Sequence, residues 1–338
     1  MMENVHCNLC GQDSATDWVV TRDRGFGPFA VVRCRRCGLC YVNPRPDEKA
    51  IAAYYPHDYY AYAEATPGSL LQRLKALFSQ VIAREYHGYV TLDPPHSHAW
   101  GIHLLLRVMA HPFRYSLLRL PPYPGKAGAR ILDVGCATGK DLDLARTCGW
   151  ETYGVDISPE AATAARRKGH QVFAGRLNEA AYPSAFFDAV MMWDVMEHLH
   201  DPRGVLEEIS RILVPGGYLL GKALNAASAQ ARIFRGQWWP GMDVPRHLYF
   251  YTPVTLRAYL GQTGFDLIRI VFHSSPRCMS ECLDLVWCDA AGRPPWQLHP
   301  LVRWIDHIIG APWAFVFDAL GAGDMMVFHA LNRRGFRS

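Results

Sequence analysis

The segment ARILDVGCATGKDLDLA, residues 129–145, constrains the fold of this chain more than any other stretch. It starts as a short apolar strand over 131–134, passes through a turn of small residues from Gly135 to Gly139, and is helical in pattern from Lys140 onward. A strand, a glycine turn and a helix in this order open a doubly wound α/β sheet. Small residues let a ligand approach the backbone, and the start of a helix favours a carboxylate or phosphate. We therefore predict an α/β fold with a ligand at this turn.

A second strand, TYGVDIS, ends on Asp156. A carboxylate at that place accepts hydrogen bonds from ribose hydroxyls. The glycine pattern from Asp133 to Gly139 is D-x-G-x-A-x-G, which departs from the dinucleotide fingerprint G-x-G-x-x-G. The predicted ligand therefore carries a ribose but is not a dinucleotide.

Four segments, in this order, resemble the class I S-adenosylmethionine (SAM)-dependent methyltransferases. They are DVGCATG (133–139), VDIS (155–158), FDAVMMWDVMEHLHDP (187–202) and LVPGGYLLGKALN (213–225). The resemblance covers roughly residues 125 to 335 and implies a Rossmann-like seven-stranded methyltransferase sheet that ends in an antiparallel hairpin. Two late apolar segments, 265–272 and 324–332, are predicted to be the strands of that hairpin.

The resemblance also implies a SAM site. Asp133 and Gly135 would hold the methionine part, Asp156 the ribose, Ile157 would pack on adenine, and Trp193 would lie near the sulfonium. The full set of expected cofactor-binding residues is Asp133, Gly135, Cys136, Gly139, Asp156, Ile157, Leu177 and Trp193. After the third strand many relatives carry an acid that contacts the adenine amine, but here Arg176 and Leu177 follow Gly175, so backbone groups around Leu177 would serve instead.

Two cysteine pairs near the N-terminus have the spacing of a zinc ribbon. Cys7-x-x-Cys10 and Cys34-x-x-Cys37 are separated by 23 residues, and four thiolates complete a closed, structural Zn²⁺ site. Cys40 forms a third C-x-x-C with Cys37, and Cys37 is preferred as the ligand because the two pairs are then symmetric. Gly11 and Gly38 follow the pairs, where turns favour a residue that adopts positive φ. WVV (18–20) and FAVV (29–32) are expected to be ribbon strands.

The ten cysteines and the first ten residues also bear on location. MMENVHCNLC contains no apolar signal region, which favours free thiols, metal ligands and a cytoplasmic protein. The apolar stretch IIGAPWAFVF (308–317) is too short to span a bilayer. We expect it to form a buried helix, with weak membrane contact as the alternative.

Composition and the positions of proline- and glycine-rich segments predict that the chain has three domains or segments. Residues 1–45 form the zinc-binding ribbon and residues 125–338 the methyltransferase domain. Between them, residues 46–124 form a tyrosine-rich arm and a helical lid, with helices near 70–90 and 100–120 and a PPYPG linker at 121–125. Tyr59 and Tyr60 are predicted to close over the substrate; a plain surface arm is the alternative.

The stretch WWPGMDVPRHLYFYTP, which ends at Pro253, follows the fifth predicted strand and is expected to build the acceptor side of the site. His247 is the predicted general base because an imidazole suits proton removal at neutral pH. Asp243 would orient it or bind a substrate hydroxyl, and Arg246 would bind a substrate carboxylate or phosphate; alternatively the two pair with each other and only stabilise the loop. The remaining predicted substrate residues are His198, Trp238 and Tyr249. Thr252 and Pro253 are predicted to start a capped helix.

The acceptor is predicted to be a small molecule. The net charge of +4 without a long basic run argues against nucleic acid. DNA amino-methyltransferases carry N/D-P-P-Y/F after the fourth strand, where this chain has Trp193-Asp194-Val195-Met196, and no Pro-Cys of a cytosine C5 enzyme occurs. The cysteine pairs, tyrosine arm and final loop resemble a branch that methylates sugars, polysaccharides and secondary metabolites.

Three alternatives stay open: a prenyl or lipid-type acceptor, RNA docked by the ribbon, and SAM binding without catalysis. The sequence leaves oxygen or carbon as the acceptor atom, and the oligomeric state, undecided.

Overall fold

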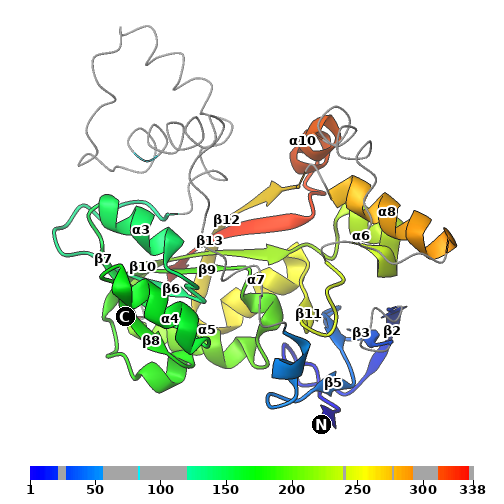
Figure 1. Cartoon of the computed structure of the whole chain (residues 1–338), viewed down its shortest axis with the longest axis horizontal. Coiled ribbons are helices and arrows are strands. Elements are labelled where there is room, and N and C mark those ends of the chain that lie inside the picture. The colour runs from blue at the N-terminus through cyan, green and yellow to red at the C-terminus, as the bar shows by residue number, and fades with distance from the viewer. Residues whose placement is uncertain are drawn as a thin grey trace, which may run out of the picture.

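The computed structural model describes residues 1–21, 28–55, 83, 120–238, 241–275, 278–291 and 311–334. Its main feature is a seven-stranded sheet with the order β12-β13-β10-β9-β6-β7-β8 (Figure 1). The strands are β6 (Arg130–Val134), β7 (Glu151–Asp156), β8 (Gln171–Ala174), β9 (Phe187–Trp193), β10 (Leu213–Leu224), β12 (Phe265–His273) and β13 (Met325–Asn332). Strands β6 to β10 pair in parallel, and β13 is antiparallel to both β10 and β12. The predicted sheet and its closing hairpin are confirmed.

Helices accompany these strands, and several of them begin at side-chain caps. They are α3 (Lys140–Thr147), α4 (Pro159–Arg167), α5 (Pro202–Ile212), α6 (Ala229–Phe234), α7 (Pro253–Gln262), α8 (Cys278–Ala291) and α10 (Ala311–Ala319). Short 3-10 helices are η1 (Ile51–Tyr54), η4 (Leu177–Ala180), η5 (Met196–His198) and η6 (Arg235–Gln237). Ser158, Asp201 and Thr252 each cap a helix whose next residue is proline, and their side chains accept backbone N–H groups that the helix leaves unpaired.

The centre of the sheet is packed on both faces, as expected for parallel strands. Residues Ala189 to Met192 of β9 are fully buried and divide between two hydrophobic clusters, one on each face. Gly221 of β10 lies in the same layer, where an added Cβ would run into the ring of Phe328 and lie 3.0 Å from Met192 Cγ. Glycine at 221 is therefore required by close packing.

Two glycine-to-alanine substitutions should have opposite effects on stability. Gly221→Ala is expected to lower the free energy of unfolding by about 1–3 kcal/mol because the core has no room for the methyl group. Gly261→Ala, in α7 with nothing within 4 Å of the added Cβ, is expected to raise it by up to about 1 kcal/mol. Urea denaturation of both variants measures the difference. Equal effects would contradict this description of the β10 core.

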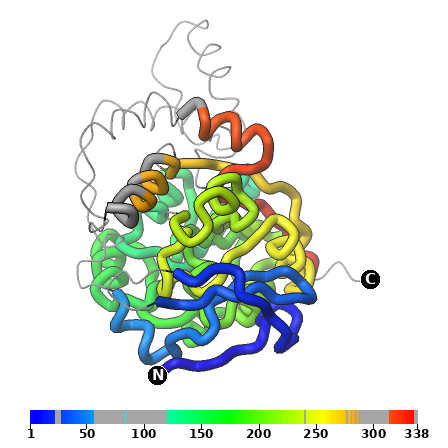
Figure 2. Tube along the Cα trace, turned by 90° about the vertical axis from the view of Figure 1, so that its right-hand side faces the viewer, coloured from blue at the N-terminus to red at the C-terminus, as the bar shows by residue number. Residues whose placement is uncertain are grey.

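The N-terminal segment forms a small sheet that includes a strand from the larger domain. Strands β2 (Ala15–Val20), β3 (Ala30–Cys34) and β4 (Cys40–Val42) are antiparallel neighbours, and β11 (Tyr249–Phe250) pairs with β4 (Figure 2). A further short pair joins β1 (Met2–Glu3) to β5 (Arg45–Pro46). The two expected ribbon strands are confirmed, but the ribbon sheet extends beyond residues 1–45 because β11 completes it.

Side-chain contacts reinforce this junction. Arg45 is buried, and its guanidinium donates to Glu3, to the Tyr249 hydroxyl at 3.0 Å and to the His200 carbonyl at 3.1 Å. Arg203 of α5 donates to the backbone carbonyls of Asn8 and Leu9 in the ribbon. The ribbon is therefore fixed directly to the segment that contains His247.

Several predictions lie at or beyond the edge of the described residues. The predicted helices near 70–90 and 100–120, apart from residues 83 and 120, and Tyr59 and Tyr60 lie outside them. The prediction of a buried helix at 308–317 was wrong in its described part: in α10, Trp313 is 50% exposed and Phe315 is 69% exposed. An apolar run does not by itself reveal which neighbours cover it. Among the described helices, none combines the length and apolarity needed to cross a bilayer.

Candidate active site and metal centre

The glycine turn after β6 is packed closely against its neighbours. Gly135 has φ +75°, and a Cβ there would lie 2.6 Å from the Val195 side chain, which follows β9. The Gly135 N–H donates to the Val155 carbonyl at 2.8 Å. Ala137 has φ 44°, a left-handed conformation that glycine adopts at lower cost. The turn thus brings the carboxyl ends of β6, β7 and β9 together.

Asp156, at the end of β7, organises this turn. Its Oδ2 accepts the Ala137 N–H at 2.7 Å and its Oδ1 accepts the Ser158 N–H at 2.9 Å. Burial raises the pKa of Asp156, and the two backbone donors offset part of this increase. Each carboxylate oxygen keeps a second lone pair, so the group can still accept two further hydrogen bonds.

The other expected cofactor residues surround this edge of the sheet. Ile157 is 71% exposed directly after Asp156, whereas Asp133, Cys136, Leu177 and Trp193 are buried. Gly139 caps α3, and an added Cβ there would crowd His170 and Ala165. The Arg176 guanidinium pairs with Glu48 at 2.6 Å, and the Arg176 backbone N–H donates to Glu179 at 2.8 Å. The exposed apolar Ile157 beside the ribose-type acid suits a bound adenosine.

The segment between η6 and β11 folds onto η5, which follows β9, and brings His247 next to Glu197 and His198. The Leu248 N–H donates to the Glu197 carbonyl at 2.7 Å, and the Tyr251 hydroxyl donates to the Met196 carbonyl at 2.9 Å. The rings of His198 and His247 lie 4.7 Å apart between centroids. Ligand-type atoms of Glu197, His198 and His247 all lie within 4.8 Å of one another.

Hydrogen bonds define the tautomers of both imidazoles. His247 Nδ1 lies 2.9 Å from the Gly241 carbonyl, and His198 Nδ1 lies 3.0 Å from the Arg246 carbonyl. A carbonyl oxygen only accepts, so Nδ1 of His247 carries the proton, and the Arg246 carbonyl favours the same tautomer for His198, with the Tyr55 hydroxyl as a second acceptor. In the neutral rings the unprotonated nitrogen is therefore Nε2. Burial lowers the pKa of His247, and burial together with His247 lowers the pKa of His198 to about 3.

Glu197 is the acid of this cluster and is 1% exposed. Burial, with a further contribution from Asp194, raises the pKa of Glu197 to about 8. Within the described part of the chain, Oε2 of Glu197 has no hydrogen-bond partner. A buried carboxyl oxygen in this state is costly unless it is protonated or meets a cation.

The remaining acceptor-side residues separate into two groups. Asp243 accepts a short hydrogen bond from Arg246 at 2.6 Å, so these two residues pair with each other as in the structural alternative. Trp238 is fully buried with Phe250 and Met242, and Tyr249 is 1% exposed, donating to His200 O and accepting from Arg45. Trp238 and Tyr249 therefore lie in the packed core and do not form an open wall, because their loop supplies β11 to the ribbon sheet.

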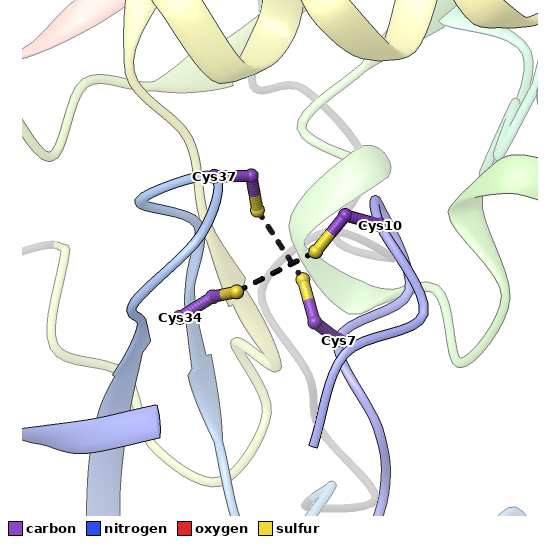
Figure 3. Close-up of side chains that lie close together, drawn as sticks. All are labelled: Cys7, Cys10, Cys34 and Cys37. Atoms are coloured by element: carbon purple, nitrogen blue, oxygen red, sulfur yellow. Dashed lines mark hydrogen bonds between the residues drawn. The ribbon is translucent and has the colours of Figure 1, made fainter. Parts of the chain in front are cut away.

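The four ribbon cysteines converge on one point (Figure 3). The Cys7 and Cys37 sulfurs lie 3.4 Å apart, and those of Cys10 and Cys34 lie 3.5 Å apart. Four thiolates at about 2.3 Å from one zinc ion would be separated by about 3.8 Å, close to these distances. The backbone N–H groups of Gly11 and Gly38 close the two turns, at φ +73° and +77°.

Cys40 lies apart from the cluster. It is buried beside Phe250, and its sulfur faces the Gly38 carbonyl at 3.8 Å. Burial raises the pKa of Cys40 to about 12. For Cys34 burial also opposes ionisation, but the backbone N–H groups of Cys37 and Arg36 outweigh it and lower the pKa to about 7. The donor set of Cys7, Cys10, Cys34 and Cys37 fits a structural zinc ion without Cys40.

Comparison with known proteins places the chain in a family. A methyltransferase domain model matches residues 106–270. The ubiquinone biosynthesis O-methyltransferase of Xanthomonas axonopodis pv. citri is 32% identical over 167 residues, which cover 45% of this chain and 67% of that protein. The chain belongs to the class I SAM-dependent methyltransferases.

Two more distant similarities accompany this match. The malonyl-[acyl-carrier protein] O-methyltransferase of Serratia marcescens is 29% identical over 130 residues, covering 38% of this chain and 50% of that protein. A SAM-dependent methyltransferase structure from Archaeoglobus fulgidus has 20% identity and a TM-score of 0.43, covering 68% of this chain and 93% of that one. The two curated relatives are matched over half to two-thirds of their own length, so their substrates do not follow from the family.

Some participants could not be found by sequence reasoning. The Gly241 carbonyl that orients His247 is a backbone atom and carries no residue-type signal. Lys222 pairs with Asp194 at 2.7 Å, across β10 and the segment after β9. Tyr55 places its hydroxyl 3.0 Å from His198 Nδ1. Of these groups, only Glu197 and His198 could be singled out from the sequence, because they lie in the segment 187–202 that resembles the methyltransferase motif around the fourth strand.

Proposed function

We propose that this chain transfers the methyl group of SAM to a small-molecule acceptor, with a sugar or secondary metabolite favoured. The observation that carries this proposal is the buried His247, whose Nδ1–H is committed to the Gly241 carbonyl while Nε2 keeps its lone pair. Val195 contacts the glycine turn, and η5 follows directly after it, so His247 lies next to the expected cofactor site.

The acceptor atom is proposed to be a hydroxyl oxygen. The two curated relatives named above are O-methyltransferases, and a hydroxyl needs a base to become a good nucleophile. His247 Nε2 would accept the hydroxyl proton, and His198, whose Nε2 is also unprotonated, would be a second base or a support. The Gly241 carbonyl would keep the ring of His247 in the required orientation.

The residues at the carboxyl edge fit SAM. The absence of a side chain at Gly135 lets Val195 pack against the turn, Asp156 retains two acceptor lone pairs, and Ile157 exposes an apolar surface beside it. Bound SAM supplies an electrophilic methyl group on a positively charged sulfur. Buried Trp193 and the pairing of β6 with β9 would help to exclude water there.

Asp156→Asn is expected to lower SAM affinity by at least about tenfold, because it removes the charge that accepts ribose hydroxyls. Calorimetric titration with SAM measures this change. Glu160→Gln, a nearby exposed acid that bonds only to the Ser158 hydroxyl among its described side-chain contacts, is the matched control and should leave the affinity unchanged. Equal SAM affinity in wild type and Asp156→Asn would remove Asp156 from the cofactor site.

A lipid-like or prenylated acceptor is the second candidate. The exposed Trp313, Phe315 and Val316 of α10 offer apolar surface, and the relative from Xanthomonas acts in ubiquinone biosynthesis by its name. This second candidate has weaker support, because no contact among the described residues connects α10 to Glu197, His198 and His247.

We also propose that Cys7, Cys10, Cys34 and Cys37 hold a structural zinc ion, with β4 and β11 joining that site to the acceptor loop. Because the ribbon uses strand β4 to pair with β11 of the same chain, we propose a structural role for the ribbon in preference to RNA docking.

The acceptor class is tested with SAM carrying a labelled methyl group. Purified protein is mixed with separated host fractions of small metabolites, glycans, lipids and RNA. We expect label in the small-metabolite fraction. Label in lipids would favour the second candidate, label in RNA would favour the ribbon-docking alternative, and SAM binding without label in any fraction would favour a non-catalytic protein.

A further inference from the structure

Glu197, His198 and His247 form a cluster whose buried acid, Glu197, makes no ion pair with the described residues. Lys222 pairs with Asp194 at 2.7 Å and Arg246 pairs with Asp243 at 2.6 Å. These two ion pairs leave Glu197 as the remaining acid, 1% exposed and, among the described residues, with no partner at Oε2. A cation bound there would therefore meet a carboxyl group that no ion pair already occupies.

Both imidazoles of the cluster present the lone pair that a metal ion needs. His198 and His247 each donate their Nδ1–H to a backbone carbonyl, which leaves Nε2 as the donor atom. Metal-binding histidines are commonly oriented by such a second hydrogen bond. Two imidazole nitrogens and one carboxylate oxygen form a familiar donor set for divalent first-row metals, and it leaves open positions for water or substrate.

The distances suit a single ion. One ligand-type atom from each residue, an imidazole nitrogen or a carboxyl oxygen, lies within 4.8 Å of the other two, and ligands about 2.1 Å from one ion are about 3–4 Å apart. Small side-chain rotations would close the difference. The three residues come from η5 and from the loop before β11, which backbone hydrogen bonds already hold together. The four ribbon cysteines offer only thiolates, whereas Glu197, His198 and His247 offer a carboxyl oxygen and two imidazole nitrogens. The two groups of ligands therefore differ in chemistry.

We propose that Glu197, His198 and His247 form a second metal site, which binds a divalent first-row cation in the acceptor pocket. This inference deepens the proposed function and rests on it for the acceptor. With the cation bound, His247 Nε2 would hold the ion instead of taking the proton. The acceptor hydroxyl would bind an open position and release its proton to water, because the cation stabilises the resulting alkoxide.

Manganese is a suitable probe because thiolates favour zinc over Mn²⁺, so a zinc-loaded ribbon does not compete for it. Mn²⁺ is titrated into the full-length, zinc-loaded protein, and free Mn²⁺ is followed by its electron paramagnetic resonance signal. We expect one Mn²⁺ per chain in the wild type. Glu197→Gln, which keeps the side-chain shape but removes the charge, and His247→Asn, which removes Nε2, should each weaken binding at least tenfold.

His329→Gln is the matched control, because His329 is a buried histidine on β13 outside the cluster, and it should bind Mn²⁺ as the wild type does. Near-UV circular dichroism shows whether each variant is folded; Glu197→Gln carries the test if His247→Asn is not. No Mn²⁺ binding by the wild type, or unchanged binding in folded Glu197→Gln, would overturn the site. Methyl transfer that persists without Mn²⁺ binding would leave the proposed function standing, whereas Mn²⁺ binding without any transfer would support the site and count against the function.

Discussion

Cys34→Ser is expected to remove one equivalent of zinc per chain and to lower the free energy of unfolding by at least about 3 kcal/mol. Cys34 ends β3, and its sulfur lies 3.5 Å from that of Cys10. Without the ion, the thiols of Cys7, Cys10 and Cys37 would no longer be joined through a common metal, and their two turns would lose that connection. Elemental analysis by mass spectrometry gives the zinc content, and denaturant unfolding gives the stability.

Cys40→Ala is the matched control for this experiment. Cys40 is also a ribbon cysteine in a C-x-x-C spacing, but it is buried in the same hydrophobic cluster as Phe250, and its sulfur faces the Gly38 carbonyl. Its zinc content should equal that of the wild type. The ribbon assignment would be contradicted if Cys34→Ser kept its zinc, or if Cys40→Ala lost it.

His247→Asn is expected to lower turnover at least about a hundredfold while leaving SAM affinity nearly unchanged. The asparagine amide can replace the donation of Nδ1–H to the Gly241 carbonyl, so the loop keeps its hydrogen bond while Nε2 is lost. Asp156 and the glycine turn lie on other segments, which is why cofactor binding should survive. Single-turnover rates and SAM titrations on the same preparation separate the two effects.

The His329→Gln protein serves again as the comparison, since it also loses a buried imidazole but not one near the glycine turn. Its turnover should stay within a few-fold of the wild type. Unchanged turnover in His247→Asn would remove His247 from the chemistry, and an equal loss in both variants would point to general destabilisation.

The sheet could be predicted from the sequence because each of its parts has a local signal. The glycine turn at 135–139, the acid ending β7 and the two late apolar strands each depend on neighbouring residues and their periodicity. The ribbon strands and the Thr252 cap are local in the same sense, and the structure contains them.

The rest depends on contacts between distant segments. The two-residue strand β11 is too short to have a periodicity, and its partner Tyr41 lies about two hundred residues earlier in the chain. That pairing buries Tyr249 and Trp238, which the sequence suggested as pocket walls. The approach of His247 to Glu197 likewise depends on a backbone bond between Leu248 and the segment after β9. A sequence read alone shows residue types, not these pairings.

The most direct test of the proposed methyl transfer, with His247 as the base, follows a ¹³C-labelled methyl group from SAM into the product. Wild type and His247→Asn are incubated side by side with the host small-metabolite fraction, and the product is examined by nuclear magnetic resonance and mass spectrometry. We expect an oxygen-bound labelled methyl group on a small molecule with the wild type and almost none with the variant. A labelled methyl group found only on RNA, or equal labelling by both proteins, would contradict it.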